Sequence, residues 1–370
     1  MRSIISTSAL AALLASGAVQ AGGLDRSGQD TSIILKEGGL FEVTSVSVKP
    51  TVTGTYDATL TALGGATATG DVTPDYSMTT MGFKMDVSDN IAVALVQDSP
   101  YGAHVKWTGG FLDGTEGKVD SSATTLMASY GLGDAVSLYG GLKSQKMTIK
   151  ADINLPFPPQ NTLAYSLSET SSNATGYLLG AAFEKPEIAL RVAFTYHPKV
   201  KHDFTTVESV NTNPVNSTAS AYAPSAYNID FQTGVAENTL LFGSIRKVNW
   251  TETDLKPTGY NIAASKSLLS YDEDTTTYSI GLGRKFTENW SAALTYGYEG
   301  ETAGDGSPLA PTNGNSKYGL GVTYNAEAFS ATIAAQKVNM GNQSAAVSTF
   351  AAAMADNSAL VTAFKISARF

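Results

Sequence analysis

The chain has 370 residues, a formal net charge of −9 and no cysteine. An acidic chain without a basic stripe argues against nucleic acid as a partner, because clustered lysine and arginine side chains are what bind phosphate groups. The lack of cysteine excludes a disulfide framework and a thiolate metal site.

Residues 1–21 have the pattern of a secretory signal peptide. Arg2 is followed by small and apolar residues from Ala9 to Val19, and the stretch ends on a small-residue cleavage pattern at Ala21. The apolar run is too short to cross a bilayer as a helix, and no later run approaches the roughly 18 apolar residues that such a helix needs. We therefore expect export from the cytoplasm.

Residues 22–39 are polar and flanked by glycines, with an apolar centre formed by Ile33, Ile34 and Leu35. The segment is too short to be a domain. It has two interpretations, a disordered leading segment or a plug that folds into the lumen of a barrel. We predict a plug, because the remainder of the chain predicts a barrel.

About fourteen strand-like runs follow, an even number of the kind found in single-chain bacterial barrels. Alternation with a period of two marks them as half-buried strands. In one run, for example, Tyr318, Leu320 and Val322 share a face. The runs lie at 40–56, 75–87, 90–107, 119–131, 135–151, 163–184, 187–207, 217–236, 238–253, 274–287, 289–300, 316–326, 328–340 and 360–370.

Short and long connections alternate between these runs. Tight turns such as 87–90 and 132–135 are followed by long connections such as 254–273 and 341–359. Outer-membrane barrels have short turns on the periplasmic side and long loops outside, whereas a β-sandwich has no reason to separate loop lengths in this way. We therefore predict an all-β fold, an antiparallel transmembrane β-barrel of about 14 strands over residues 40–370.

Two further patterns favour the bacterial outer membrane. Aromatic residues gather beside the short turns, as expected of an interfacial girdle in contact with outer-membrane lipid. The run from Leu360 to Phe370 alternates and ends on an aromatic residue. It resembles the C-terminal signal through which the outer-membrane assembly machinery inserts bacterial barrels. We expect a monomer.

Three stretches resemble the FadL/TodX family of outer-membrane transporters for long-chain fatty acids and other hydrophobic compounds. They are residues 176–202, residues 223–250, and residues 289–298 together with 317–324. The resemblance implies plug-gated uptake of a hydrophobic small molecule such as a fatty acid. Residues 22–39 contain no Asn-Pro-Ala element of the family's N-terminal hatch and are shorter than that hatch.

The third long connection carries apolar residues on an otherwise polar loop, among them Leu155 and Phe157. Such residues either form a capture groove for a hydrophobic solute or pack against a neighbouring loop. The family's groove lies between the third and fourth extracellular loops. The resemblance therefore favours capture there, with Val207 and Val215 as partners from the fourth loop.

The run 90–107 contains Pro100, Tyr101 and Gly102. Proline donates no hydrogen bond to a neighbouring strand, so the run either ends at Ser99 or is kinked. We predict a kink that leaves a gap in the wall. The resemblance implies the same, because the family has an inward kink in its third strand that provides a lateral exit.

Four basic residues of the run 187–207 are predicted to share the face opposite its apolar one, in the lumen or at its outer rim. They could receive a carboxylate headgroup or pair with acidic residues of the plug. These residues are Arg191, His197, Lys199 and Lys201.

Enzyme and metal-site motifs are missing from the sequence, including Gly-x-Ser-x-Gly, His-Glu-x-x-His and a phosphate-binding loop. The histidines His104, His197 and His202 lack the spacing of a metal pair. We predict a transport protein rather than an enzyme, with no cofactor and no metal. The alternatives are a general diffusion porin for small polar solutes and an adhesin or structural barrel.

Overall fold

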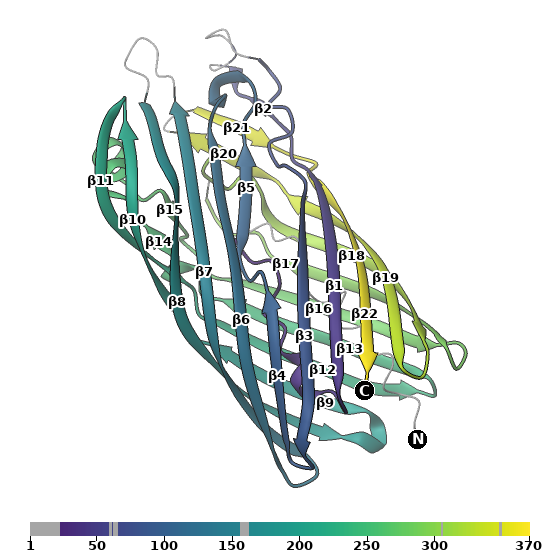
Figure 1. Ribbon diagram of the computed structural model, residues 1–370. Coiled ribbons are helices and arrows are strands. Elements are labelled where there is room, and N and C mark those ends of the chain that lie inside the picture. Colours follow the sequence, from purple (N-terminus) through teal and green to yellow (C-terminus); the bar gives the residue numbers. More distant parts are fainter. Residues whose placement is uncertain (1–22, 59–60, 62–65, 156–162, 305, 348–349) are drawn as a thin grey trace.

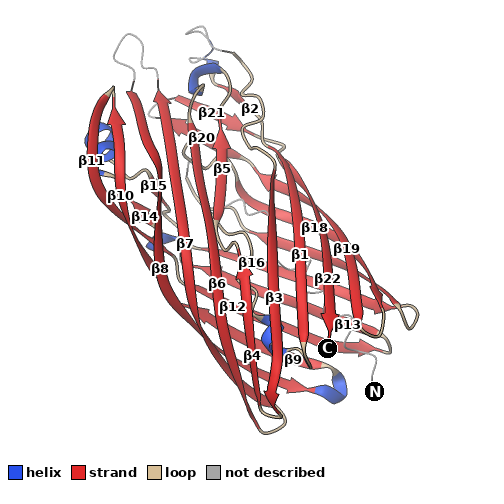
Figure 2. Ribbon diagram, in the orientation of Figure 1, coloured by secondary structure: helices blue, strands red, loops and turns tan. Residues whose placement is uncertain are grey.

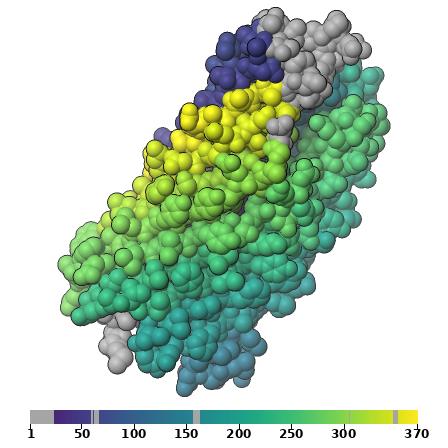
Figure 3. All heavy atoms as spheres, turned by 180° about the vertical axis from the view of Figure 1, so that it is seen from behind, coloured from purple at the N-terminus to yellow at the C-terminus, as the bar shows by residue number. Residues whose placement is uncertain are grey.

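The computed structural model describes residues 23–370 except 59–60, 62–65, 156–162, 305 and 348–349. The predicted signal peptide therefore lies outside the described residues. One antiparallel sheet of 17 strand segments closes on itself, and three of its strands consist of two segments each, which gives the predicted barrel of 14 strands. Figure 1 shows the barrel in outline, and from behind its strands form oblique bands from teal through green to yellow (Figure 3).

The barrel strands follow one another in chain order around the wall, and each pairs with its neighbours in the sequence. They are β1 (Leu40–Thr51), β3 (Tyr76–Ser88), β4 (Ile91–Asp98) with β5 (Gly102–Lys106), β6 (Glu116–Leu132), β7 (Val136–Leu155), β8 (Leu163–Lys185), β9 (Leu190–His197) with β10 (Val200–Val210), β11 (Asn213–Ala223) with β12 (Ala226–Ala236), β13 (Thr239–Val248), β16 (Thr275–Lys285), β17 (Trp290–Glu299), β18 (Asn313–Asn325), β19 (Phe329–Gly341) and β22 (Ser358–Arg369).

Residue alternation determines which side of each strand meets the membrane. In β18 the side chains of Tyr318, Leu320 and Val322 are exposed on the outer surface, whereas Gly319 and Gly321 face the lumen. The register pairs Leu320 with Leu294 of β17, so apolar side chains of neighbouring strands lie together on the outside. The predicted girdle residues next to the short turns are also exposed: Tyr130, Phe183, Phe286, Trp290, Tyr324, Phe329 and Phe370.

Connections at the two ends of the barrel differ in length, as Figures 1 and 2 show. The long ones contain elements that the alternation did not predict. Among the described residues, no helix has the length and apolarity required to cross a membrane. The additional elements are β2 (Gly54–Tyr56), β20 (Gln343–Val347) and β21 (Phe350–Met354) in one small sheet, β14 (Asp254–Leu255) paired with β15 (Leu269–Ser270), the helix α3 (Thr258–Ala264), and the 3-10 turns η2 (Gly110–Leu112) and η4 (Trp250–Glu252).

Proline accounts for the three divided strands. The breaks contain Pro100, Pro198 and Pro224, and each lies in a run that the pattern had suggested to be a single strand. Proline has no backbone N–H to donate to a neighbouring strand, so the backbone hydrogen bonding between strands stops there.

The first and last strands close the barrel through a continuous register from Leu40↔Arg369 to Thr51↔Ser358. The buried carboxylate of Glu42 strengthens this seam. It accepts hydrogen bonds from Lys365 Nζ at 3.0 Å and Ser367 Oγ at 2.7 Å. Lys36 Nζ, which belongs to the segment before β1, donates to the same carboxylate at 2.7 Å.

The substitution Glu42→Gln is expected to weaken the seam, because it leaves two lysines facing each other with no buried negative charge. Removing one partner of a buried ion pair costs about 3–5 kcal/mol in the free energy of unfolding. Urea unfolding in phospholipid vesicles measures this difference. Glu237→Gln, in an exposed short turn, is the control. Equal unfolding midpoints for the two variants would contradict the role given to Glu42.

Candidate functional site

A gap interrupts hydrogen bonding in the wall between β3 and the divided strand β4–β5. The register between β3 and β4 stops at Met81↔Gln97, whereas β5 continues to pair with β6 from Gly102↔Asp120 onward. In the described chain, the next backbone bond across the break is that from Lys106 N to Val72 O, 2.8 Å. We call the stretch between residues 73–80 and 98–105 the wall gap.

The N-terminal segment, residues 23–39, supplies the hydrogen bonds that the wall gap lacks. Arg26 N donates to Pro100 O at 2.8 Å, and Gly102 N donates to Leu24 O at 2.7 Å. Asp25 and Tyr101 thereby form an antiparallel bridge. Because buried backbone groups are costly to leave unpaired, the segment serves as the neighbour that β3 does not provide.

The side chain of Arg26 lies across the wall gap and contacts both of its sides. Its guanidinium is 4.1 Å from the ring centroid of Tyr76 on β3, within range of a cation–π interaction. It packs so closely against Gly102 that a Cβ there would be 2.5 Å from Arg26 Cζ. Arg26 Nη1 is also 3.9 Å from Asp120 Oδ1 on β6. A buried arginine, 7% exposed, therefore fills the gap.

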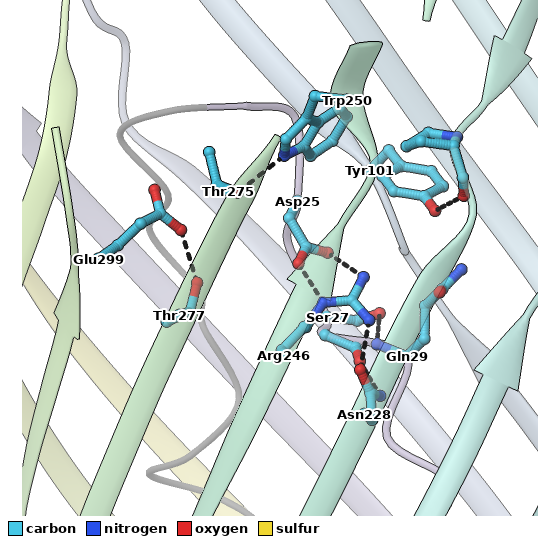
Figure 4. Close-up of polar contacts among 12 residues, drawn as sticks. Asp25, Ser27, Gln29, Tyr101, Asn228, Arg246, Trp250, Thr275, Thr277 and Glu299 are labelled. Carbon is cyan, nitrogen blue, oxygen red and sulfur yellow. Dashed lines mark hydrogen bonds and ion pairs between the residues drawn. The ribbon is translucent and has the colours of Figure 1, made fainter. Parts of the chain in front are cut away.

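A buried ion pair holds the N-terminal segment to the opposite part of the wall (Figure 4). The guanidinium of Arg246 on β13 binds Asp25 through two hydrogen bonds, one of them 3.0 Å from Nη2 to Oδ1. Arg246 Nη1 also donates to Asn228 Oδ1 at 2.7 Å, and Asn228 Nδ2 donates to Gly28 O at 3.1 Å. Two-point arginine–carboxylate contacts are the stronger kind of ion pair and fix the orientation of both groups.

The kinked strand reaches a second divided strand through Tyr101. The Tyr101 hydroxyl donates to Pro224 O at 3.3 Å, at the break between β11 and β12. Its ring meets Trp250 edge-on at 5.9 Å, and Trp250 Nε1 donates to Thr275 Oγ1 at 3.1 Å. The kink is therefore fixed from inside the barrel.

Towards β1, the N-terminal segment contains the apolar residues 33–35 followed by the basic residue Lys36. Ile33 and Ile34 in the turn η1 (Ser32–Leu35) are buried against inward-facing residues of β4, β6, β7, β8 and β9. The Leu35 carbonyl accepts a hydrogen bond from Arg191 Nη1 at 3.1 Å. Burial, together with the neighbouring charge of Lys365, lowers the pKa of Lys36 to about 8. Mildly alkaline solution therefore weakens the ion pair between Lys36 and Glu42.

A cavity of about 360 Å³ lies between the N-terminal segment and the long loops. Residues 23–26 line one side of it, and β5 with the side chains of Ile153 and Leu155 forms part of its wall. Residues 266–273 and 306–313 contribute the lining from two loops. Tyr76 and Gly102, which flank the wall gap, belong to the same lining. The cavity and the gap therefore adjoin each other, with Arg26 between them.

Of the four residues predicted to form a capture groove, the structure describes three and does not bring these three together. Leu155 is buried and lines the cavity, whereas Phe157 lies outside the described residues. Val207 is 54% exposed on the outer face of β10, and Val215 is half-buried on the neighbouring β11. The fourth loop is only the tight turn at 211–212, so both valines belong to strands rather than to a loop.

The predicted cluster of four basic residues does not form, and this interpretation was wrong. The break at Pro198 shifts the alternation, so that Arg191 and His197 face inward whereas Lys199 and Lys201 lie on the outer surface. There Lys199 Nζ is 3.4 Å from Glu252 Oε1, and Lys201 Nζ is 2.8 Å from Asp203 Oδ1. Arg191 binds the Leu35 carbonyl rather than an acidic side chain of the segment.

Sequence reasoning named Asp25 as an acid of the plug that could pair with a basic residue, but it missed Arg26, Arg246 and Trp250. The sequence alone can indicate a charged residue on the inward face of a strand, such as Arg246 in β13. It does not indicate which residue pairs with Arg246, because Asp25 is 221 positions away.

Comparison with known proteins agrees with this architecture. The family model described as outer membrane protein transport protein (OMPP1/FadL/TodX) matches residues 31–370. A search of curated protein sequences finds no match.

Several solved structures share the fold at low sequence identity. A Pseudomonas aeruginosa FadL homologue has a TM-score of 0.76 at 14% identity, covering 100% of this chain and 98% of its own. The Pseudomonas putida toluene transporter TodX has a TM-score of 0.64 at 11% identity, with coverages of 96% and 98%. The Ralstonia pickettii toluene transporter TbuX has a TM-score of 0.65 at 12% identity, with coverages of 96% and 97%.

Identities this low establish the fold alone, whereas the family model spans nearly the whole described chain. This protein therefore belongs to the outer membrane protein transport protein (OMPP1/FadL/TodX) family.

Proposed function

We propose that this protein mediates passive uptake of long-chain fatty acids or similar hydrophobic compounds across the bacterial outer membrane. The observation that carries the proposal is that one short segment covers both a cavity with a partly apolar lining and a gap in the barrel wall. Similar structures point to the same class of solute, since TodX and TbuX are described as toluene transporters.

The cavity has the size and lining of a small-molecule site. Its volume of about 360 Å³ is within the usual range of ligand pockets, roughly 300–1,000 Å³. Leu24, Val105 and Leu155 supply apolar walls. Contact with these side chains favours binding of a hydrophobic solute over its staying in water. Burying apolar surface contributes roughly 25 cal/mol of favourable free energy per Å².

In the proposed route residues 22–39, which include the N-terminal segment described above, act as the plug. Solute collects in the cavity, the plug moves, and the solute leaves sideways past Pro100, Tyr101 and Gly102. The contacts of Arg26 support a coupling of these steps. Withdrawing Arg26 from between Tyr76 and Gly102 opens the cavity toward the wall gap in the same movement.

The solute class is tested by uptake of labelled oleate and labelled toluene in cells that lack their own fatty-acid transporter. We expect oleate uptake several-fold above that of cells with the empty vector, because Leu24, Val105 and Leu155 offer the acyl chain an apolar wall inside the cavity. Heat-dependent mobility on gels confirms insertion of the barrel. Uptake of toluene but not oleate would mean that the solute is a small aromatic hydrocarbon rather than a fatty acid. Uptake of neither compound, together with a large steady ion conductance, would favour a general diffusion porin.

Gating by the plug is tested with Asp25→Ala. The variant leaves Arg246 buried without its carboxylate, which costs about 3–5 kcal/mol and favours release of the segment. We expect a steady rise in ion conductance across planar bilayers. Asp30→Ala is the matched control, since Asp30 is an exposed acid of the same segment whose hydrogen bonds within the described chain go to Ser32. Native conductance in both variants would show that the segment does not close the pore.

A further inference from the structure

The carboxylate of Glu208 lies inside the barrel wall and binds three strands at once. It is 2% exposed and accepts hydrogen bonds from Tyr165 Oη on β8 at 3.0 Å, Thr206 Oγ1 at 2.9 Å and Ser217 Oγ on β11 at 2.7 Å. Within the part of the chain that the structure describes, no lysine, arginine or histidine forms an ion pair with it. These three neutral donors are all held in place by the wall.

A fourth donor to Glu208 comes from outside the wall. Tyr260 N, near the start of α3, donates to Glu208 Oε2 at 3.2 Å. A Cβ at Gly259 would lie 2.7 Å from the same oxygen, so a side chain there would displace the carboxylate or the helix. The rings of Tyr165 and Tyr260 also meet edge-on at 5.0 Å. The helix therefore contacts the wall through this hydrogen bond and through the Tyr165–Tyr260 ring pair.

The helix belongs to residues 249–274, the connection between β13 and β16, which we call loop 5. Its two arms are joined by the short pair β14–β15, so loop 5 is tied to itself. Its base is fixed separately, since Thr253 Oγ1 donates to Tyr222 O at 2.9 Å and Thr251 Oγ1 donates to Asp274 Oδ1 at 2.8 Å. Loop 5 is therefore held together by its own backbone pairing and is fixed to the wall at its base.

Loop 5 also forms one side of the cavity. Tyr260, Leu268, Leu269 and Tyr271 all contribute to the cavity lining. A solute that comes from outside must pass the long loops before it reaches the N-terminal segment. The contact between Glu208 and Tyr260 N is therefore placed to control how far loop 5 can move from the cavity.

We propose that Glu208 is a positioning residue that holds loop 5 as a lid over the cavity. The solute gains access when the helix leaves Glu208, and the return of the helix encloses the solute. This inference rests on the proposed function and adds to it a second movable part, on the outer side of the cavity. The carboxylate suits this role because the wall donors keep it in place whether or not Tyr260 is bound.

The test breaks the contact from each side, with Glu208→Gln in the wall and Gly259→Ala in the lid. The double variant and two matched controls complete the set. Glu169→Gln changes an exposed glutamate on the neighbouring β8. Gly297→Ala adds a methyl group in the wall where the nearest side chain is 3.5 Å away. Heat-dependent gel mobility establishes that each barrel is folded.

Trypsin added to intact cells reports release of the lid. Lys266 lies in loop 5 and is exposed, whereas Lys256 precedes Pro257 and resists cleavage. We expect cleavage after Lys266 to be about tenfold faster in each single variant, as for loss of one hydrogen bond to a charged group. The double variant is expected to match the single ones, because both changes break the same contact. If all three variants were cleaved after Lys266 no faster than the two control variants, the proposal would be overturned.

Oleate uptake over a range of concentrations separates a lid from a merely structural contact. Release of the lid is expected to raise the half-saturating concentration about threefold without lowering the maximal rate, because solute escapes more easily. A fall in maximal rate alone, in proportion to the amount of folded barrel, would overturn the proposal. If the native protein takes up neither oleate nor toluene, the proposed function fails and the lid's role fails with it. The trypsin result still decides whether Glu208 holds loop 5.

Discussion

A barrel in a membrane depends on the pairing of its backbone groups, because lipid offers them no hydrogen bonds. Pro100 breaks that pairing between β4 and β5, so the structure has to satisfy the kinked strand from elsewhere. It does so with the N-terminal segment, whose Leu24 and Arg26 bond to the residues on either side of Tyr101. The same segment thus completes the hydrogen bonding of the kinked strand and packs against inward-facing residues of the wall.

A buried ion pair between Asp25 and Arg246 fixes the N-terminal segment in this position. Asp25 and Arg246 are almost fully buried and bind each other at two points, which makes their geometry exacting. The N-terminal segment therefore has a well-defined position, in which it lies against both the cavity and the wall gap.

The sequence predicts the barrel well because its signals are local. Alternation, the even number of runs and the alternation of short and long connections need no knowledge of distant contacts. The site is harder, because one proline can reverse a face: Pro198 placed Lys199 and Lys201 outside although the uninterrupted pattern places them with Arg191. The partners of Arg26 and Glu208 could not be inferred either, since they come together only when distant strands meet.

The carboxylate of Glu42 couples the closing seam of the barrel to the N-terminal segment. It binds Lys365 of the last strand and Lys36 of the N-terminal segment, so the seam and the segment share one anion. A barrel that sealed its first strand to its last before the segment had docked would bury this carboxylate with only part of its hydrogen-bond set. Glu42 has its full set of hydrogen bonds only when the last strand and the N-terminal segment are both in place.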